Sequence, residues 1–334
     1  METRFLTFFL YVALSLMLVS CQPSSERLVV TRTTIPVFGT LTEVQIRHPK
    51  GEPPTEAVQA LEQLFQRLHK DWHPWEPGAL TELNKRLMLG DWTTIPNDLY
   101  VLLATSQRME MLSEGAFNAA IGQLVSLWGF HTSEYPITEP PPSPEAISKL
   151  VNKTPSTLGI LHRENARGET EIMTPEVGLR LDFSGIAKGG AAQLACDLLN
   201  EYGLGDALVN LGGDVMICGK AAKPWRVAIK DPRAGVLEII EVSEPMAVFT
   251  SGQYYRWGEW QGERYAHVLN PKTGYPIEHV LQATAIHADP LIADAAATAL
   301  VVAGPMRASA LGQTLGLSQW GLVDDEGNIR WSDF

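Results

Sequence analysis

The sequence has few cysteines and no run of lysine or arginine. Its three cysteines are too few and too scattered for a zinc cluster. Lysine and arginine number 26 against 38 aspartates and glutamates, which gives a formal net charge of −12. Because a nucleic-acid binder needs a basic face that displaces counterions from phosphates, broad nucleic-acid binding is not expected. A negatively charged substrate would need a local device, such as a metal ion, a helix N-terminus or a single lysine.

The chain also lacks the composition of a disordered protein, an internal repeat and a G-x-G-x-x-G pattern. Glycine and proline make up about 15% of it, below the roughly 25–30% typical of low-complexity disorder. Apolar residues make up 45% and can fill a sizeable core. At about 150 residues per domain, a chain of 334 residues holds two domains or one elaborate one.

An apolar segment from Phe5 to Val19 follows Arg4 at the N-terminus. It is shorter than the roughly 20 residues of a spanning helix, and its position is typical of a secretory signal. It ends in Leu-Val-Ser before Cys21, which resembles the lipobox of bacterial lipoproteins, where the peptide is cut before a cysteine that then carries several acyl chains. We expect a signal peptide at 1–20, a tether at 21–30 and a lipid-anchored protein of the bacterial cell envelope facing the periplasm. An ordinary signal peptide with a chance cysteine is the alternative.

Two further cysteines remain in the mature chain. Cys196 lies in an apolar helical pattern, which favours a buried thiol. A bond to Cys218 in an oxidising compartment is the alternative, and the spacing leaves it open.

Hydrophobic periodicity predicts strands over 34–46 around Gly39, a helix over 58–68 that starts near Pro54, and a helix from Asn97 to Leu112. A proline-rich loop follows at 136–144. Further helices are expected at 188–202 and 290–302, and further strands at 179–183, 207–211, 225–230, 238–243, 246–250 and 282–287. Because the strands come in runs without strict alternation with helices, the pattern favours an α+β fold.

Two glycine-containing segments are candidates for ligand binding. Asp182 to Gly190 lies where a strand meets a helix, so a ligand can approach the backbone there and Lys188 adds a positive charge. A tight turn with a surface lysine explains this segment as well. Ala207 to Asp214 is a strand that enters a double-glycine turn, and Asp214 is expected to bond the backbone of its own turn.

Two other segments carry titratable or hydroxyl groups. His267 alternates with apolar residues before a polar turn, which fits a catalytic group or a satisfied core histidine. Asp294 and Thr298 share one helix face, and their hard oxygen atoms suit Mg²⁺. A helix-terminal aspartate and a threonine bonded to the backbone are the alternative, which the spacing alone favours.

Taken in order, these segments resemble the ApbE family of FAD:protein FMN transferases. That family shows a DxSxIAKG-like segment, an ALVNLGGD strand, a TSG turn, an HxxDPxTGxP segment and an ADAxAT helix. The chain has counterparts at 182–189, 207–214, 250–252, 267–276 and 293–298. Weaker matches are 38–40, the stretch from Trp75 to Asn84 and 115–118, and the resemblance covers about residues 30–325.

The resemblance implies an ApbE-type domain over 31–334, with mixed and antiparallel sheets, helices and FAD in a cleft between two subdomains. It implies Mg²⁺-dependent transfer of FMN from FAD to a Ser or Thr hydroxyl of a partner protein, which forms a phosphoester and releases AMP. His267 would be the general base, and Mg²⁺ would be held by the carbonyl of Gly185 and the side chains of Asp294 and Thr298. The FAD site would be lined by Trp75, Ala116, Phe117, Asn118, Asp182, Lys188 and Val268.

The family's acceptors suggest a subunit of a membrane electron-transport complex, either a sodium-pumping quinone reductase or an Rnf-type complex. One alternative is an Mg²⁺-dependent FAD pyrophosphatase, in which water replaces the acceptor hydroxyl. Another is a flavin-binding lipoprotein without turnover, which the presence of His267, Asp294 and Thr298 disfavours. Asn118 and Asn270 stand where the family usually has aspartate, and each amide adds a hydrogen-bond donor.

Overall fold

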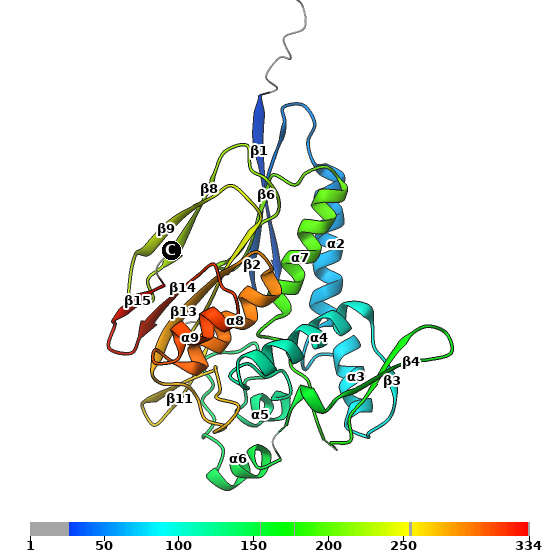
Figure 1. The fold of residues 1–334 in the computed structure, drawn as a ribbon, viewed down its shortest axis with the longest axis vertical. Coiled ribbons are helices and arrows are strands. Elements are labelled where there is room, and N and C mark those ends of the chain that lie inside the picture. The colour runs from blue at the N-terminus through cyan, green and yellow to red at the C-terminus, as the bar shows by residue number, and fades with distance from the viewer. Residues whose placement is uncertain (1–26, 154, 177, 254–255, 333–334) are drawn as a thin grey trace, which may run out of the picture.

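The computed structural model describes residues 27–153, 155–176, 178–253 and 256–332, which form one large sheet with helices packed on it (Figure 1). The expected signal peptide and Cys21 lie outside these residues. The sheet has eight strands in the order β1-β2-β6-β7-β10-β13-β14-β15, and all neighbouring pairs are antiparallel. These strands are β1 Leu28–Val37, β2 Thr40–Pro49, β6 Ala207–Leu211, β7 Asp214–Ile217, β10 Met246–Gly252, β13 Val280–His287, β14 Gln319–Asp324 and β15 Ile329–Trp331. The predicted α+β class is confirmed.

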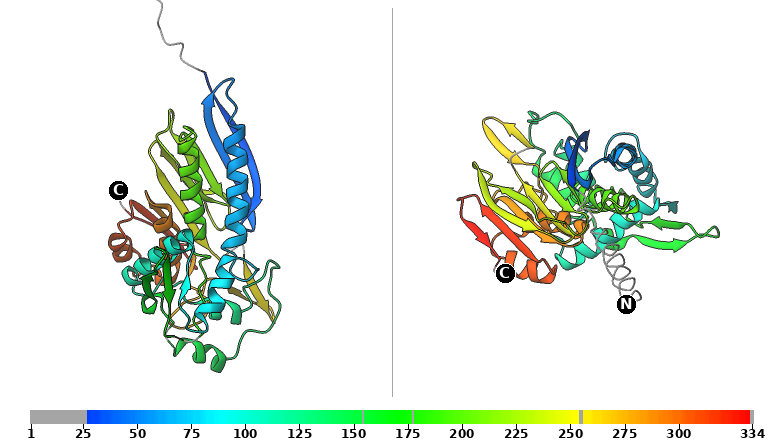
Figure 2. Two further views of the ribbon diagram at one scale, coloured as in Figure 1. Left: turned by 90° about the vertical axis from the view of Figure 1, so that its right-hand side faces the viewer. Right: turned by 90° about the horizontal axis from the view of Figure 1, so that it is seen from above.

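Helices cover one face of the sheet. Helices α7 (Ala187–Glu201) and α8 (Pro290–Ala303) contact each other, and they pack on β6, β7, β10 and β13. Helix α2 (Thr55–Asp71) lies alongside α7, and α4 (Asn97–Leu112) contacts α8 (Figure 2). These four helices confirm the periodicity of the sequence. The others are α3 Ala79–Leu87, α5 Gly122–Leu127, α6 Pro144–Val151, α9 Ala308–Thr314 and the short 3₁₀ turn Thr157–Gly159.

A separate hairpin covers the opposite face of the sheet. It consists of β8 (Trp225–Lys230) and β9 (Val236–Val242), and its apolar side chains pack on sheet residues that include Leu208 and Val248. Their neighbours Val209 and Phe249 belong to the main core on the helix side, as the two-residue period of a strand requires. Two further small sheets are present among the described residues. One contains β3 Thr93–Thr94, β5 Thr170–Met173 and β4 Leu161–Glu164, and the other contains β11 Trp257–Trp260 and β12 Glu263–Ala266.

Local sequence explains where key elements begin and end. Phe38 and Gly39 both have positive φ, +56° and +69°, as a two-residue hairpin turn between β1 and β2 requires. Helix α8 is capped by the side chain of Asp289, which accepts the backbone N–H of Leu291 at 2.9 Å. Almost every residue of α8 is buried, so the helix that carries Asp294 is held on all sides.

Two boundary predictions are wrong. Residues 179–183 form no ladder strand and make one isolated bridge, between Arg180 and Ile121. A side chain replaces the missing strand partner, because Asn84 bonds both the N–H and the carbonyl of Leu181 at 2.8 Å. Strand β1 begins at Leu28, inside the segment expected to be a tether.

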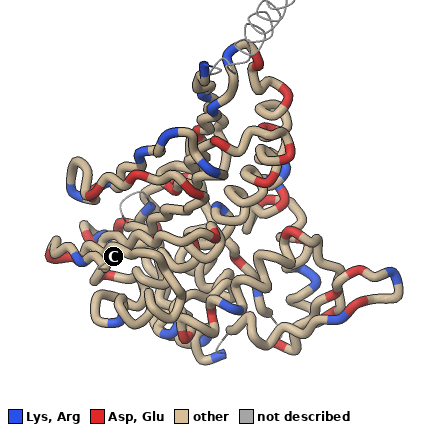
Figure 3. Tube along the Cα trace, turned by 45° about the horizontal axis from the view of Figure 1, so that its top comes forward, with Lys and Arg blue, Asp and Glu red and all other residues tan. Residues whose placement is uncertain are grey.

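The main core is continuous from the helix face of the sheet through α2, α4, α7 and α8. Lys and Arg are interspersed with Asp and Glu along the chain, and no long stretch of one sign is visible (Figure 3). Among the described residues, no helix combines the length and the apolar character needed to cross a membrane. The predicted division into two subdomains with a cleft stays a prediction.

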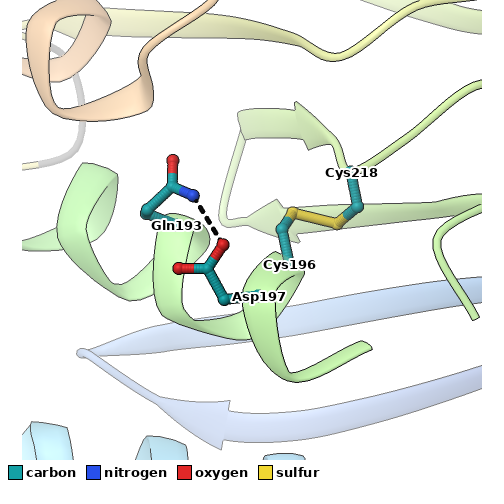
Figure 4. Close-up of a disulfide and its surroundings, with 4 residues drawn as sticks. All are labelled: Gln193, Cys196, Asp197 and Cys218. Carbon is teal, nitrogen blue, oxygen red and sulfur yellow. Dashed lines mark hydrogen bonds between the residues drawn. A yellow bond between two sulfur atoms is a disulfide. The ribbon is translucent and has the colours of Figure 1, made fainter. Parts of the chain in front are cut away.

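A disulfide joins Cys196 on α7 to Cys218, just beyond the end of β7 (Figure 4). The prediction of a buried free thiol at Cys196 is therefore wrong. Both cysteines are buried, and their Cα atoms are 4.8 Å apart. The apolar setting that suggested a buried thiol also suits a buried disulfide, so the helical pattern alone could not separate the two.

Candidate active site

Lys188 and two buried carboxylates form a charged cluster where α7 meets the sheet. Lys188 is in the first turn of α7, Asp214 begins β7, and the ammonium group of Lys188 pairs with Asp214. Burial would lower the pKa of Lys188, but Asp214 and Asp294 outweigh it and raise that pKa above its usual value. Lys188 is therefore charged, and about a third of its side chain is exposed.

The predicted role of Asp214 is wrong. Its carboxylate is buried and accepts the N–H of Thr250 at 2.8 Å, in addition to pairing with Lys188. The double-glycine turn is braced by Asn210 instead, whose side-chain oxygen accepts the N–H of Gly213 at 2.7 Å. Asp214 thus belongs to the charged cluster.

Asp294 lies on α8, close to the N-terminus of α7. Its carboxylate accepts the N–H of Gly189 at 2.8 Å, and only 5% of the residue is exposed. A side chain at Gly189 would collide with the carbonyl of Pro290, so glycine is required for this approach of the two helices. Burial raises the pKa of Asp294 well above its usual range; Lys188 opposes this change and Asp214 adds to it.

The predicted metal ligands lie together. Thr298 follows Asp294 by one turn, and its Oγ1 lies 3.0 Å from Oγ of Ser251. A Cβ placed on Gly185 would be 3.3 Å from Oγ1 of Thr298 and 3.2 Å from the ring of Phe117. Where the structure describes the chain, no three His, Cys, Asp or Glu side chains form a possible metal site. A cation here would depend on one carboxylate together with hydroxyl and carbonyl oxygens, which is a donor set that Mg²⁺ accepts.

His267 directly follows β12 and is partly buried. Its Nδ1 lies 3.1 Å from the backbone carbonyl oxygen of Arg256, and its ring meets Phe130 edge-on, with the centroids 6.3 Å apart. Burial, with a further contribution from the Arg256 guanidinium, lowers the pKa of His267 to about 4. The imidazole is therefore neutral near pH 7 and can accept a proton.

Arg256 supplies a second positive charge beside this histidine. A Cβ on Gly39 would lie 3.2 Å from its guanidinium, which also stands 5.9 Å from the centre of the Tyr135 ring. No hydrogen bond or ion pair joins the guanidinium to any residue that the structure describes. Arg256 and Lys188 are thus two positive charges that act on the pKa of His267.

Trp75 and Asp182 are also brought together. His131 stacks on Trp75, with ring centroids 5.3 Å apart and planes inclined by 22°, and its Nε2 lies 2.9 Å from Oδ2 of Asp182. Burial would raise the pKa of Asp182, but hydrogen bonds from His131 and Ser184 outweigh it and lower that pKa. An aromatic ring and an ionised carboxylate thus both contact His131.

The sequence matches one known family over most of its length, since residues 38–318 fit the ApbE family. The chain belongs to the ApbE family. It is 33% identical to the FAD:protein FMN transferase of Rhodobacter capsulatus over 298 residues. This alignment covers 89% of this chain and 56% of that protein. It is 30% identical to the FAD:protein FMN transferase of Klebsiella pneumoniae over 315 residues. This alignment covers 92% of this chain and 88% of that protein. The chain therefore spans little more than half the length of the first relative and most of the second.

Solved ApbE structures share the fold. The apo form of the Pseudomonas stutzeri flavinyl transferase ApbE has a TM-score of 0.77 at 29% identity, over 91% of this chain and 94% of that one. The ApbE protein of Thermotoga maritima has a TM-score of 0.76 at 27% identity, over 92% of this chain and 97% of that one. The ApbE-type fold expected from the sequence motifs is confirmed.

The remaining residues expected at the FAD site lie in tightly packed segments. Ala116, Phe117 and Val268 are buried. Both polar atoms of the Asn118 amide bond within the protein, since Nδ2 donates to the Pro155 carbonyl at 2.8 Å and Oδ1 accepts the N–H of Ala120 at 2.7 Å. The extra donor of this ApbE member therefore braces a loop.

Asn270, the other departure from the family pattern, also braces backbone. Its Oδ1 accepts the N–H of Lys272 at 2.9 Å in the turn that follows His267. An aspartate oxygen could accept the same bond, so this substitution keeps the turn.

The sequence interpretation missed His131 and Arg256. His131 meets Asp182, which is 51 residues away along the chain, and no local periodicity signals such a contact. Arg256 follows the TSG turn at a short distance, and its position beside His267 becomes visible only once β11 and β12 are paired.

Proposed function

We propose that this protein transfers FMN from FAD to a Ser or Thr hydroxyl of a partner protein, forming a phosphoester and releasing AMP. The observation that supports this most directly is the charged Lys188 between the buried carboxylates of Asp214 and Asp294, near a neutral His267. Displacement at a phosphorus atom needs these two elements, a positive charge for the phosphate oxygens and a base for the nucleophile. The relatives named FAD:protein FMN transferase support the choice of FAD and of a protein acceptor.

His267 would accept the proton of the acceptor hydroxyl on Nε2, because its Nδ1–H is already directed at the carbonyl of Arg256. The acceptor oxygen then forms a bond to the FMN phosphorus, and the bond from that phosphorus to the bridging oxygen breaks. AMP leaves with the electron pair of the broken bond. Lys188 would neutralise charge on the phosphate oxygens throughout, since it is charged and partly exposed.

The residues present fit Mg²⁺. The carbonyl of Gly185, the carboxylate of Asp294 and the hydroxyl of Thr298 would hold it, and all three offer hard oxygen atoms. A carboxylate whose pKa is raised by burial, as at Asp294, is a group that a cation would stabilise. When bound, the ion would supply Lewis-acid polarisation of the phosphate oxygens.

The protein would act in the bacterial cell envelope, lipid-anchored through Cys21 and facing the periplasm. The Cys196–Cys218 disulfide supports an oxidising compartment, because disulfides are rare where thiols are kept reduced. The acceptor would be a subunit of a sodium-pumping quinone reductase or of an Rnf-type complex.

The test incubates the purified chain with FAD, Mg²⁺ and a candidate acceptor subunit. Flavin fluorescence that stays on the acceptor in a denaturing gel, together with release of AMP, supports the transferase. AMP release without labelled acceptor would indicate an FAD pyrophosphatase instead. Binding of FAD without AMP release would indicate a flavin-binding protein without turnover.

A further inference from the structure

His131 makes two contacts that no local sequence pattern indicated. Its ring stacks on Trp75, and its Nε2 lies 2.9 Å from Oδ2 of Asp182. Both members of the polar pair are nearly inaccessible, with 7% of the His131 side chain and 4% of the Asp182 side chain exposed. A buried histidine thus links the aromatic face and the carboxylate expected to line the FAD site.

Within the described part of the chain, one His131 nitrogen has no hydrogen-bond partner. An ionised carboxylate can only accept, so Nε2 of His131 carries the shared hydrogen. Nδ1 is buried and has no hydrogen-bond partner among the residues that the structure describes. An unpaired buried polar atom is costly, and it is typical of a place that a ligand or a water molecule completes.

The surroundings hold both partners of His131 in place. Trp75 also contacts His73 edge-on, with the ring centroids 4.3 Å apart. The second oxygen of Asp182 accepts the N–H of Ser184 at 2.8 Å. Loss of His131 would therefore free one contact of Trp75 and one contact of Asp182, while each keeps another.

The same short segment reaches the proposed base. Phe130, which precedes His131, packs edge-on against His267 with the centroids 6.3 Å apart. A shift of His131 would thus also move Phe130 against His267. The segment Phe130–His131 thus contacts Trp75, Asp182 and His267.

We propose that His131 is a positioning residue that fixes Trp75 and Asp182 for the flavin ring of FAD. A flavin ring is flat and carries a ring N–H, so an aromatic face and an ionised acceptor suit it. The inference rests on the proposed function, because it takes FAD as the substrate. It assigns His131 to recognition of the flavin half, whereas Lys188 acts on the phosphates.

Two substitutions separate the two contacts. His131→Phe keeps a ring for Trp75 but cannot donate to Asp182, whereas His131→Gln can still donate but has no ring. His48→Gln is the matched control, since His48 is a buried histidine that bonds Thr31 at 2.8 Å in the β1–β2 hairpin. All variants are compared with wild type in one Mg²⁺ buffer for melting temperature, Kd for FAD, Kd for ADP, and the kcat and KM of transfer.

We expect wild type to bind FAD more tightly than ADP. His131→Phe should raise Kd for FAD about tenfold to a hundredfold, the range for a lost hydrogen bond to a charged group, and leave Kd for ADP unchanged. His131→Gln should recover part of the loss, and His48→Gln should match wild type. If either His131 variant fails to fold, the other tests the inference through the same ratio of Kd for FAD to Kd for ADP.

An unchanged ratio of FAD to ADP affinity in the folded His131 variants would overturn the inference. That outcome includes an equal loss of affinity for both ligands, which a merely structural role predicts. If wild type itself shows no preference for FAD over ADP, the proposed function fails before His131 is considered. The two failures are therefore distinguishable.

Discussion

Nδ1 of His267 lies 3.1 Å from the backbone carbonyl oxygen of Arg256. Because a carbonyl oxygen can only accept, Nδ1 carries the proton and Nε2 is left with its lone pair. The guanidinium of the same arginine adds to burial in lowering the pKa of His267 to about 4. Arg256 thus fixes the tautomer of His267 through its backbone and helps to keep the ring neutral through its charge.

Replacing Arg256 should move the pH dependence of transfer. Protonated His267 cannot accept a proton, so the wild-type rate should fall only at acidic pH, around the lowered pKa of about 4. Arg256→Gln removes one cause of that low pKa, so the acidic limb should move to higher pH while burial still holds it below 6.5. Arg256→Lys keeps the charge and should keep the limb near its wild-type position. Rates at saturating FAD across the acidic range check this, and an unmoved limb in Arg256→Gln would contradict it.

Lys188 should act mainly on FAD binding. A phosphate contact is partly made before reaction, so Lys188→Ala should raise the apparent KM for FAD about tenfold to a hundredfold. Asp214→Asn should raise the KM for FAD less. Lys188 then loses one carboxylate that holds its ammonium group but keeps Asp294 as a neighbour. Asp231→Asn, which removes the partly buried partner of the exposed Arg233, is the control and should leave KM unchanged. Equal kinetics for Lys188→Ala and the control would exclude Lys188 from the phosphate site.

Asp294→Asn should separate metal binding from folding. The amide oxygen can still accept the N–H of Gly189, and the variant no longer buries a carboxyl group whose charged form burial disfavours. Without Mg²⁺, the variant should melt at the wild-type temperature or above it. Added Mg²⁺ should raise the melting temperature of wild type alone, and transfer should be lost in the variant. Full activity of the variant at limiting Mg²⁺ would remove Asp294 from the metal site.

The disulfide should stabilise the fold. Cys196 and Cys218 are 22 residues apart, and closing a loop of this size contributes about 3 kcal/mol to the free energy of unfolding. Urea unfolding of wild type with and without a thiol reductant measures this contribution. The Cys196→Ser, Cys218→Ser double variant should resemble reduced wild type and should not respond to the reductant. Identical curves for oxidised and reduced wild type would show that the bond contributes nothing.

Much of the fold could be predicted from local pattern. Periodicity, caps and a glycine turn predict helices α2, α4, α7 and α8 and the β1–β2 hairpin. Helix α3 was missed because it follows a stretch rich in tryptophan, proline and glycine. The expected strand at 179–183 failed because a side chain, Asn84, takes the place of a neighbouring strand, and periodicity cannot show this.

The site was predictable only where one element carries several of its groups. Asp294 and Thr298 share a helix face, so spacing alone placed them together. The pairings of Asp214 with Lys188 and of His131 with Asp182 join separate elements, and they depend on the order of strands in the sheet and on long loops. For Asp214, the local turn preference pointed to a different role from the one that tertiary structure gives it.

The most direct test of His267 as the base is FMN transfer by His267→Ala at saturating FAD, with FAD affinity and melting temperature measured on the same sample. A neutral imidazole that carries its lone pair on Nε2 predicts that transfer falls by roughly 10²–10⁴ while FAD affinity and melting temperature stay near wild type. Unchanged transfer, or a loss that follows unfolding alone, would contradict it.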